Sequence, residues 1–421
     1  MANTPNIRFK GFADDWEQRK LGEIVERVTR KNQDLVSTLP LTISAQYGLI
    51  DQNEFFDKRV ASKDVSYYYL VKKGEFAYNK STSSDAPWGA IKRLDRYEKG
   101  VLSTLYIVFA ISENAEIDSD YLVTYYDTNL WHRGIREIAA EGARNHGLLN
   151  IAPADFFKTS LSVPQDIEEQ KAIGKYFTEL NALITLHQRK CDEVKQLKKF
   201  MLQKMFPKNG ELIPEIRFAG FTDDWEQHKL GEFSDIKTGP FGSTLHADDY
   251  INDGMPIITT EHFKSGQLPT VKDGIPQVSE NDYCRLSSYI LNINDIVFSR
   301  VGSVDINALV TPFQDKWLFS GRVLRVRPYA EIDSMFLHTL LETDSVRNDI
   351  ISRAVGQTMP SINTEILKIT SLCLPQDIDE QREIGEYFCI FDRLINFHQH
   401  KCDQLKEVKR FMLQNVFPQK G

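Results

Sequence analysis

Two stretches of the chain place apolar residues in alternating steps of four and three. In the stretch from Glu168 to about Met205 these positions are Ile173, Phe177, Leu180, Ile184, His187, Cys191 and Val194. In the second stretch they are Ile384, Phe388, Phe391, Ile395, His398, Cys402 and Leu405. Such spacing keeps one stripe facing a partner helix. We therefore expect two helices of about 38 residues, each roughly 57 Å long, which pack on each other and relate two halves by a pseudo-twofold.

The remainder of each half shows short β-rich runs broken by Gly, Asn, Asp and Pro. The predicted strands are Leu41 to Ser44, Tyr67 to Val71, Glu75 to Tyr78, Thr104 to Ile111, Ile257 to Thr260, Asp295 to Phe298 and Arg322 to Arg327. Helical pieces follow, from Asp118 to Glu141 and from Ser334 to Ala354. Each half is therefore expected to hold a β-rich α+β domain.

The sequence blocks at both ends of the first half recur at both ends of the second half. The block from Pro5 to Glu23 returns as Pro214 to Glu232, and the block from Val163 to Gly210 returns as Leu374 to Gly421. Residues 25–160 and 234–372, between these blocks, resemble each other only faintly. Two copies with so long a period are not a solenoid. Matched ends with unmatched middles indicate a shared scaffold that presents two different recognition surfaces.

This pattern predicts four segments. Residues 1–162 form a first recognition domain that includes the block 5–24, and residues 163–213 form the central helix and linker. Residues 214–373 form a second recognition domain that includes the block 214–233, and residues 374–421 form the last helix.

Charge and composition restrict the partners. The net charge of -8 argues against the simplest picture of DNA binding, so cations must cluster or a partner must supply them. The second variable segment does gather arginines, although an ordinary solvated surface is the alternative for any one of them: Arg300, Arg322, Arg325, Arg327, Arg347 and Arg353. No stretch approaches the roughly 20 apolar residues that span a bilayer. We expect a cytoplasmic protein without a membrane partner.

Two pairs of polar segments in the variable parts line up. Lys80 to Ser83 follow a predicted strand in the first half, as Ser299 to Ser303 do in the second. Arg144 to His146 occupy the place of Gln357 and Thr358. Such loops can donate to phosphates and base edges, yet they equally suit tight turns. The predicted DNA-binding residues are Lys80, Ser81, Thr82, Ser83, Arg144, Asn145, His146, Ser299, Arg300, Ser303, Arg322, Arg353, Gln357 and Thr358.

Signatures of catalysis are missing from the sequence. There is no phosphate loop, no Gly-rich turn for S-adenosylmethionine and no Asn-Pro-Pro or Asp-Pro-Pro tetrad. Glu193-Val-Lys195 and Glu407-Val-Lys409 superficially match half of a nuclease element but lie among solvated helix charges. The five cysteines show no C-x-x-C spacing. Cys191 and Cys402, each preceded by a histidine one turn earlier, could bind metal if the two pairs met; buried seam residues are the other interpretation. We predict no catalytic residue and no metal site.

Duplicated L-P-x-x-x-E-Q blocks, strands ending in Lys80 and Arg300, and the Gly356-Gln-Thr-Met-Pro turn resemble the DNA-specificity subunit of a type I restriction-modification system. The resemblance covers essentially the whole chain. It implies two target recognition domains held apart by two conserved antiparallel helices, each domain reading one half of a split site in double-stranded DNA. It also implies partners: two adenine methyltransferase subunits and up to two ATP-driven restriction subunits, which carry S-adenosylmethionine, ATP and Mg.

Arg144-Asn-His-Gly departs from the turn found in the second half, so the resemblance implies an asymmetric bipartite target. Half-sites met on one face of the duplex should lie about one helical turn, or 10 base pairs, apart. We expect the long helices and the two opening blocks to dock the methyltransferases, with Trp16 and Trp225 as core anchors. A two-domain DNA-binding regulator or scaffold without a methyltransferase partner is one alternative. An enzyme with an unrecognised active site is another.

Overall fold

The structure, a computed structural model of the chain, describes residues 4–44, 47–58, 60–84, 86–139, 144–145, 147–208, 210–240, 245–246 and 249–418, with only the backbone at 144–145. It forms two compact units. The first unit comprises Met1–His187 and His400–Gly421, and the second comprises Gln188–Gln399. The boundary falls within both long helices, so each unit contains one end of each helix. None of the helices in the described residues combines the length and the apolarity that a membrane span requires.

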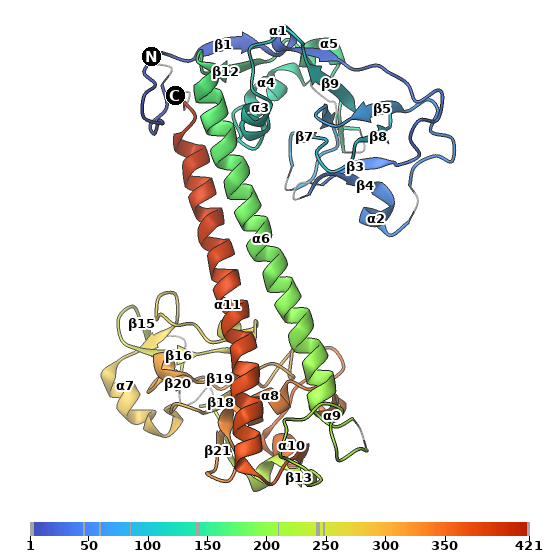
Figure 1. Cartoon of the computed structure of the whole chain (residues 1–421). Coiled ribbons are helices and arrows are strands. Elements are labelled where there is room, and N and C mark those ends of the chain that lie inside the picture. Colours follow the sequence, from blue (N-terminus) through green and yellow to red (C-terminus); the bar gives the residue numbers. More distant parts are fainter. Residues whose placement is uncertain are drawn as a thin grey trace. The chain divides into compact units, whose positions relative to one another are not determined.

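A four-stranded antiparallel sheet forms the centre of the first unit (Figure 1). Its strand order is β2 (Val25–Arg27), β9 (Ile107–Ile111), β6 (Phe76–Asn79) and β7 (Ala90–Arg93). Three short helices follow in sequence: α3 (Ser119–Tyr126), α4 (His132–Ile138) and α5 (Pro153–Phe156). A separate ribbon joins β1 (Glu17–Lys20) from the opening block to β12 (Ser160–Val163), which leads into the long helix α6 (Ile167–Met205).

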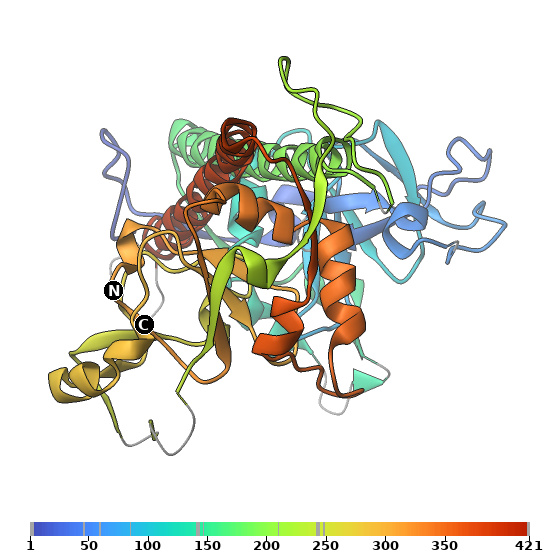
Figure 2. The ribbon, with the colours of Figure 1, turned by 90° about the horizontal axis from the view of Figure 1, so that it is seen from below.

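The second unit repeats this plan. Its antiparallel sheet has the order β14 (Ser234–Thr238), β21 (Val323–Pro328), β18 (Ile296–Ser299) and β19 (Asn307–Leu309). The short helices are α8 (Ser334–Leu341), α9 (Asp344–Arg353) and α10 (Thr364–Lys368), seen in orange in Figure 2. The ribbon pairs β13 (Glu226–Lys229) with β22 (Ser371–Leu374), ahead of the long helix α11 (Ile378–Asn415). The predicted α+β class and the internal repeat are confirmed.

Each unit also carries an outer lobe, and here the two halves differ. The first lobe has two separate two-stranded sheets, the hairpin β3–β4 and the pair β5–β8, with the short helix α2; the second has one mixed four-stranded sheet with helix α7. The bounds are β3 (Leu41–Ser44), β4 (Gly48–Asp51), α2 (Gln52–Phe56), β5 (Tyr69–Lys72), β8 (Lys99–Leu102), β15 (Tyr250–Ile251), β16 (Met255–Ile258), β17 (Gln277–Val278), α7 (Glu280–Arg285) and β20 (Leu318–Phe319). The lobes are therefore where the two variable segments diverge most in fold.

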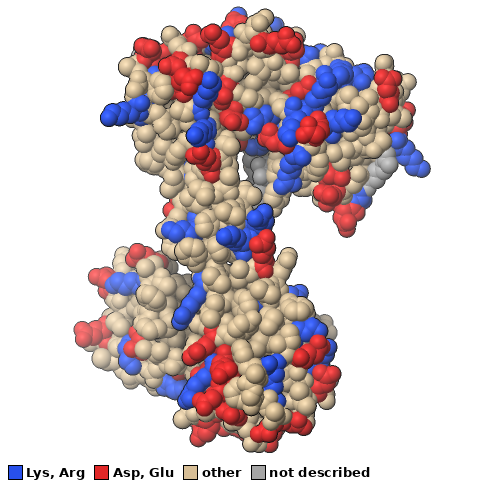
Figure 3. Space-filling view, in the orientation of Figure 1, with Lys and Arg blue, Asp and Glu red and all other residues tan. Residues whose placement is uncertain are grey.

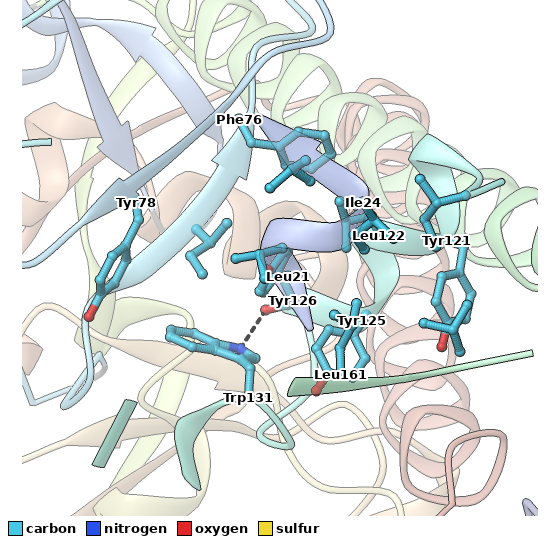
Figure 4. Close-up of a cluster of buried hydrophobic side chains, with 14 of the residues drawn as sticks. Leu21, Ile24, Phe76, Tyr78, Tyr121, Leu122, Tyr125, Tyr126, Trp131 and Leu161 are labelled. Carbon is cyan, nitrogen blue, oxygen red and sulfur yellow. Dashed lines mark hydrogen bonds between the residues drawn. The ribbon is translucent and has the colours of Figure 1, made fainter. Parts of the chain in front are cut away.

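Apolar side chains of the sheet and helices form the core of the first unit. Figure 4 shows Phe76 and Tyr78 from β6 with Tyr121, Tyr125 and other residues of the helical segment. The Trp131 indole N–H donates to the Tyr126 carbonyl at 3.1 Å, which satisfies its polar group inside this core. The predicted helix from Asp118 to Glu141 is thus two helices, because the segment turns at Asp127 to bring Trp131 back onto the sheet.

The long helices α6 and α11 contact each other within each unit (Figure 1). In the second unit the Cys191 thiol lies 3.8 Å from the Ile395 carbonyl, and Lys198 meets Asp392, so the helices run antiparallel. In the first unit the Cys402 thiol lies 4.0 Å from the Ile184 carbonyl. Both cysteines are completely buried. Their prediction as buried residues of the helix seam is confirmed.

Candidate DNA interface

The duplicated opening block is tied to the start of the long helix in the same way in both units. Arg8 donates to both carboxylate oxygens of Glu169 at 2.7 and 2.8 Å, and Arg217 does the same to Glu380 at 2.6 and 2.8 Å. Each glutamate is only 1% exposed. A buried carboxylate requires such a bidentate partner. The motif therefore has an internal structural role.

The glutamine that follows each of these glutamates hydrogen-bonds to the residue just before a short helix of the same unit. Gln170 accepts a hydrogen bond from the backbone N–H of Asp118 at 2.8 Å and donates to the Pro164 carbonyl at 2.9 Å. Gln381 makes the equivalent bonds to Asp333 and Pro375, both at 2.9 Å. The duplicated Glu-Gln pair thus fixes the short helix α3 or α8 against the long helix that carries it.

Gly174 lies inside α6 because α3 approaches there. A Cβ at this position would lie 2.7 Å from the backbone nitrogen of Tyr121. Gly385 in α11 meets Phe336 of α8 in the same way, at 2.6 Å. Glycine inside a helix costs stability, so its repeated use indicates that this close contact is required.

Each long helix ends in the core of the unit that contains the other copy's opening block. Phe417, at the end of the chain, packs edge-on against Trp16 at a centroid distance of 5.8 Å. Phe206, which follows α6, packs against Trp225 at 5.8 Å. Trp16 and Trp225 are 3% and 0% exposed, which confirms their prediction as core anchors.

A lysine near each of these ends enters a partly buried ion cluster. Lys409 bonds to Asp127 at 2.9 Å, and Lys92 bonds to the other oxygen of Asp127 at 2.7 Å. Burial opposes the charge of Asp127, yet Lys92 and Lys409 together hold its pKa below the ordinary value.

The cluster in the second unit has one lysine and two carboxylates, whereas the first has two lysines and one carboxylate. Lys198 bonds to Glu342 at 2.5 Å and to Asp392 at 2.7 Å. Burial opposes the charge of Lys198, but the two carboxylates raise its pKa. With His338 these carboxylates are the group of potential metal ligands found among the described residues. The ammonium group of Lys198 supplies the positive charge there.

Two polar loops meet in the first unit at the end of β6. The backbone N–H of Leu149 donates to the Lys80 carbonyl at 3.0 Å, and that of Thr82 donates to the Gly147 carbonyl at 2.7 Å. The Thr82 hydroxyl also donates to Gly147, at 3.0 Å. β11 (Leu148–Leu149) pairs here with β10 (Arg144–Asn145). The two segments that the sequence singled out are thus adjacent in the fold.

The equivalent loops meet in the second unit with the same register. The backbone N–H of Ile362 donates to the Arg300 carbonyl at 2.9 Å, and that of Gly302 donates to the Pro360 carbonyl at 2.8 Å. A third segment joins them, because the Arg300 N–H donates to the Arg322 carbonyl at 2.9 Å. The loops at residues 300–303, 321–322 and 355–362 therefore form one surface at the end of β18.

The predicted residues differ in access. Exposed side chains belong to Ser81, Ser83, Ser303, Arg322, Gln357 and Thr358, and half-buried ones to Lys80, Thr82, Arg300 and Arg353. Burial lowers the pKa of Lys80, whereas a hydrogen bond to Asp349 raises the pKa of Arg353. Ser299 is buried and donates to the Val301 carbonyl at 3.2 Å, which fits the tight-turn alternative. The side chains of Arg144 and Asn145, and all of His146, lie outside the described residues.

Both signs of charge occur on the visible face of each unit. Figure 3 shows lysine and arginine interspersed with aspartate and glutamate on this face. Several arginines of the predicted cluster are neutralised locally: Arg325 pairs with Asp235, Arg327 with Asp295, and Arg347 with Asp305. Arg322 is the exposed member of the group. The sequence alone did not show these pairs, because their partners lie on strands or loops distant along the chain.

Two α+β units of one plan, each with adjoining polar loops, define an internally duplicated protein. The family described as "Type I restriction modification DNA specificity domain" matches residues 222–407. The chain is 21% identical over 409 residues to the type I restriction enzyme MjaVIII specificity subunit of Methanocaldococcus jannaschii, covering 94% of this chain and 91% of that one. Residues 222–407 thus match the DNA specificity domain of type I restriction-modification systems, and nearly the whole chain is similar to a specificity subunit of such a system.

Two further similarities accompany these matches. A putative type I restriction enzyme MjaX specificity subunit of the same organism is 27% identical over 215 residues, covering 49% of this chain and 48% of that one. The fold matches the crystal structure of a type I restriction-modification S subunit from M. genitalium with a TM-score of 0.63 and 13% identity. That match covers 99% of this chain and 100% of the other, so the fold is shared along the whole length.

Proposed function

We propose that the chain reads a bipartite, asymmetric site in double-stranded DNA, one half-site by each unit. The observation that carries this proposal is the matched pair of loops at Lys80 and Arg300. Their backbones hydrogen-bond in the same register, whereas their side chains differ: Lys-Ser-Thr-Ser in the first unit and Arg-Val-Gly-Ser in the second. Loops with matching backbone hydrogen bonds and different side chains suit two units that recognise different base sequences.

The exposed residues of these loops suit different contacts with DNA. Arg322 and Gln357 can pair bidentately with guanine and adenine, and Ser81, Ser83 and Thr358 can donate to either phosphates or base edges. Arg300 donates to the Gly321 carbonyl at 3.2 Å, so it supports the arginine-bearing loop as well as facing the solvent. Ser299 is assigned to the turn rather than to the DNA.

Two equivalent docking surfaces for methyltransferase subunits are supported by matched exposed apolar residues on the long helices. Leu183 and its counterpart Leu394 are 46% and 41% exposed, and Phe200 and Phe411 are 48% and 56% exposed. Leu186 and Leu197 of α6 are likewise exposed, as are Phe397 and Val408 of α11. Apolar surface left uncovered at the same positions in both copies fits two copies of one partner.

In this proposal the chain itself carries no catalysis and no cofactor. S-adenosylmethionine belongs to the methyltransferase subunits, into whose pocket the target adenine must leave the base stack. ATP and Mg belong to up to two restriction subunits. The specificity subunit determines which adenine is presented.

Coexpression of the chain with its methyltransferase, followed by genome-wide mapping of methylated adenines, tests this function. We expect a split motif with a fixed spacer and two different half-sites. Arg322→Gln should relax one half-site and leave the other half-site and the spacer unchanged, while Arg133→Gln, an exposed arginine of α4 that pairs with Glu137, should change neither half-site. An unsplit motif, or methylation independent of this chain, would contradict the proposal.

A further inference from the structure

An open cleft of about 770 Å³ lies in the second unit between the end of α6 and the turn that joins α8 to α9. Lys195, Lys199, Lys204 and Lys208 line it from the helix and the residues just after it. Thr343 and Arg347 are among the residues that line the opposite side. The loop-reading site described above uses none of these residues.

Lysines of this cleft are only partly neutralised. Lys195 and Lys199 are exposed and make no ion pair within the described part of the chain. Lys204 and Lys208 share one carboxylate, that of Glu215. By contrast Lys198, at the back of the cleft, is fully paired with Glu342 and Asp392. The accessible part of the helix side therefore offers uncompensated ammonium groups to an anion.

Helix α9 connects the cleft to the reading loops. It begins at the cleft with Asp344 and ends at Arg353, immediately before the loop that carries Gln357. Its 10 residues span about 15 Å. Arg347 is also paired with Asp305, two residues beyond Ser303. Each strand of a duplex held at the loops presents one phosphate per roughly 3.4 Å of duplex axis. Several phosphates therefore fall within the roughly 15 Å that α9 spans between the loops and the cleft.

We propose that this cleft binds backbone phosphates of the DNA beside the half-site read by the second unit. The inference rests on the proposed function. It adds a contact that is independent of base sequence and that uses the ammonium groups of Lys195 and Lys199 as phosphate ligands.

The duplicated sequence supports this assignment. Lys406 and Arg410 of α11 stand at the positions equivalent to Lys195 and Lys199, and both are exposed in the first unit. Phosphates recur identically at both half-sites, whereas bases differ. Matched cations therefore suit phosphate contacts, just as unmatched loops suit base reading.

DNA binding by the complex of the full chain with its methyltransferase subunits, measured across a salt series, tests the inference. The probes are a duplex that carries the mapped motif and an unrelated duplex of equal length. For Lys195→Gln/Lys199→Gln we expect the slope of log K against log salt to fall by about 2 for both duplexes, with affinity near 0.1 M salt reduced more than tenfold. The methylated motif should stay unchanged. Lys171→Gln, an exposed lysine in the first turns of the same helix that pairs with Glu168, is the control and should leave the slope unchanged.

Three results would overturn the inference. An unchanged slope with unchanged affinity would show that no phosphate is bound here. Loss of the methyltransferase subunits from the double variant, seen by size-exclusion chromatography, would assign the cleft to a protein partner. An altered methylation motif would assign it to base reading. The unrelated duplex keeps the test separate from the proposed function, because the loss of two phosphate contacts in the double variant would lower the slope for that duplex even if no split motif were found.

Discussion

At the scale of single residues, the pairs Arg8–Glu169 and Arg217–Glu380 explain why the opening block is repeated. Arg217→Met would leave Glu380, whose side chain is 1% exposed, without its bidentate partner. We expect the second unit to lose about 3–5 kcal/mol of unfolding free energy, because an unpaired buried carboxylate must be desolvated or protonated. Urea unfolding followed by circular dichroism measures this loss.

Arg382→Met is the matched control for that change. Arg382 pairs with Asp379 on the surface of the same helix, where the two side chains are 58% and 73% exposed. Removing it should cost no more than about 1 kcal/mol, as is typical of exposed ion pairs. Equal losses in the two variants would show that the buried pair does not hold the block in place.

The same residue types show what sequence can and cannot reveal. Trp16 and Trp225 were predictable as core anchors because they recur within a doubled block, and Cys191 because it lies on the apolar stripe. Lys198 stands in the sequence among several lysines near a helix end, yet it is 8% exposed. Its partners Glu342 and Asp392 lie 144 and 194 residues away in the chain, so helical spacing gave no sign of them.

At the scale of elements, the ends of α6 and α11 are held by clusters of different composition. Lys198→Met would leave the half-buried carboxylates Glu342 and Asp392 beside each other without the ammonium group that bridges them. Lys409→Met would leave Asp127 still paired with Lys92. We expect the first change to cost about 3–5 kcal/mol in the second unit. The second change should cost the first unit only about 1–2 kcal/mol.

Differential scanning calorimetry on both variants compares these costs. The lower transition should belong to the unit that carries the substitution, and the shift should be larger for Lys198→Met. A larger shift for Lys409→Met would mean that Lys92 does not hold the Asp127 carboxylate by itself, and would reverse the assigned order of the two clusters.

At the scale of the whole molecule, the sequence revealed the repeat but underestimated its extent. The variable segments share a four-stranded sheet with the same connectivity, although they resemble each other only faintly in sequence. Buried strands accept many combinations of Val, Ile, Leu and Phe, so identity is lost while the fold remains. The outer lobes and the exposed loop side chains differ because they are under no such common constraint. The contacts of those loops with bases depend on the position of a bound duplex, which neither the sequence nor the fold of the free chain specifies.

The exchange of helix ends between the two copies yields the last prediction. The core of the first unit includes Val416 and Phe417 from the end of the chain, and the core of the second includes Met205 and Phe206. The connection after Phe206 is exposed at Lys208 and from residue 210 to 213. A chain cut between Gly210 and Glu211 should therefore reassemble from two coexpressed fragments, because each fragment supplies a helix end that buries large apolar side chains in the other unit.

Affinity purification through a tag on one fragment should recover both in equal amounts, and the pair should direct the same methylation motif as the intact chain. The matched control replaces Phe206 and Phe417 by alanine. Each replacement removes a fully or nearly buried aromatic ring at a cost of about 3–5 kcal/mol. We expect the substituted fragments no longer to copurify. The intact chain with both replacements should retain more activity than the substituted fragments, because its two copies remain covalently linked. Recovery of folded single fragments would mean that each unit is complete without the helix end of the other copy.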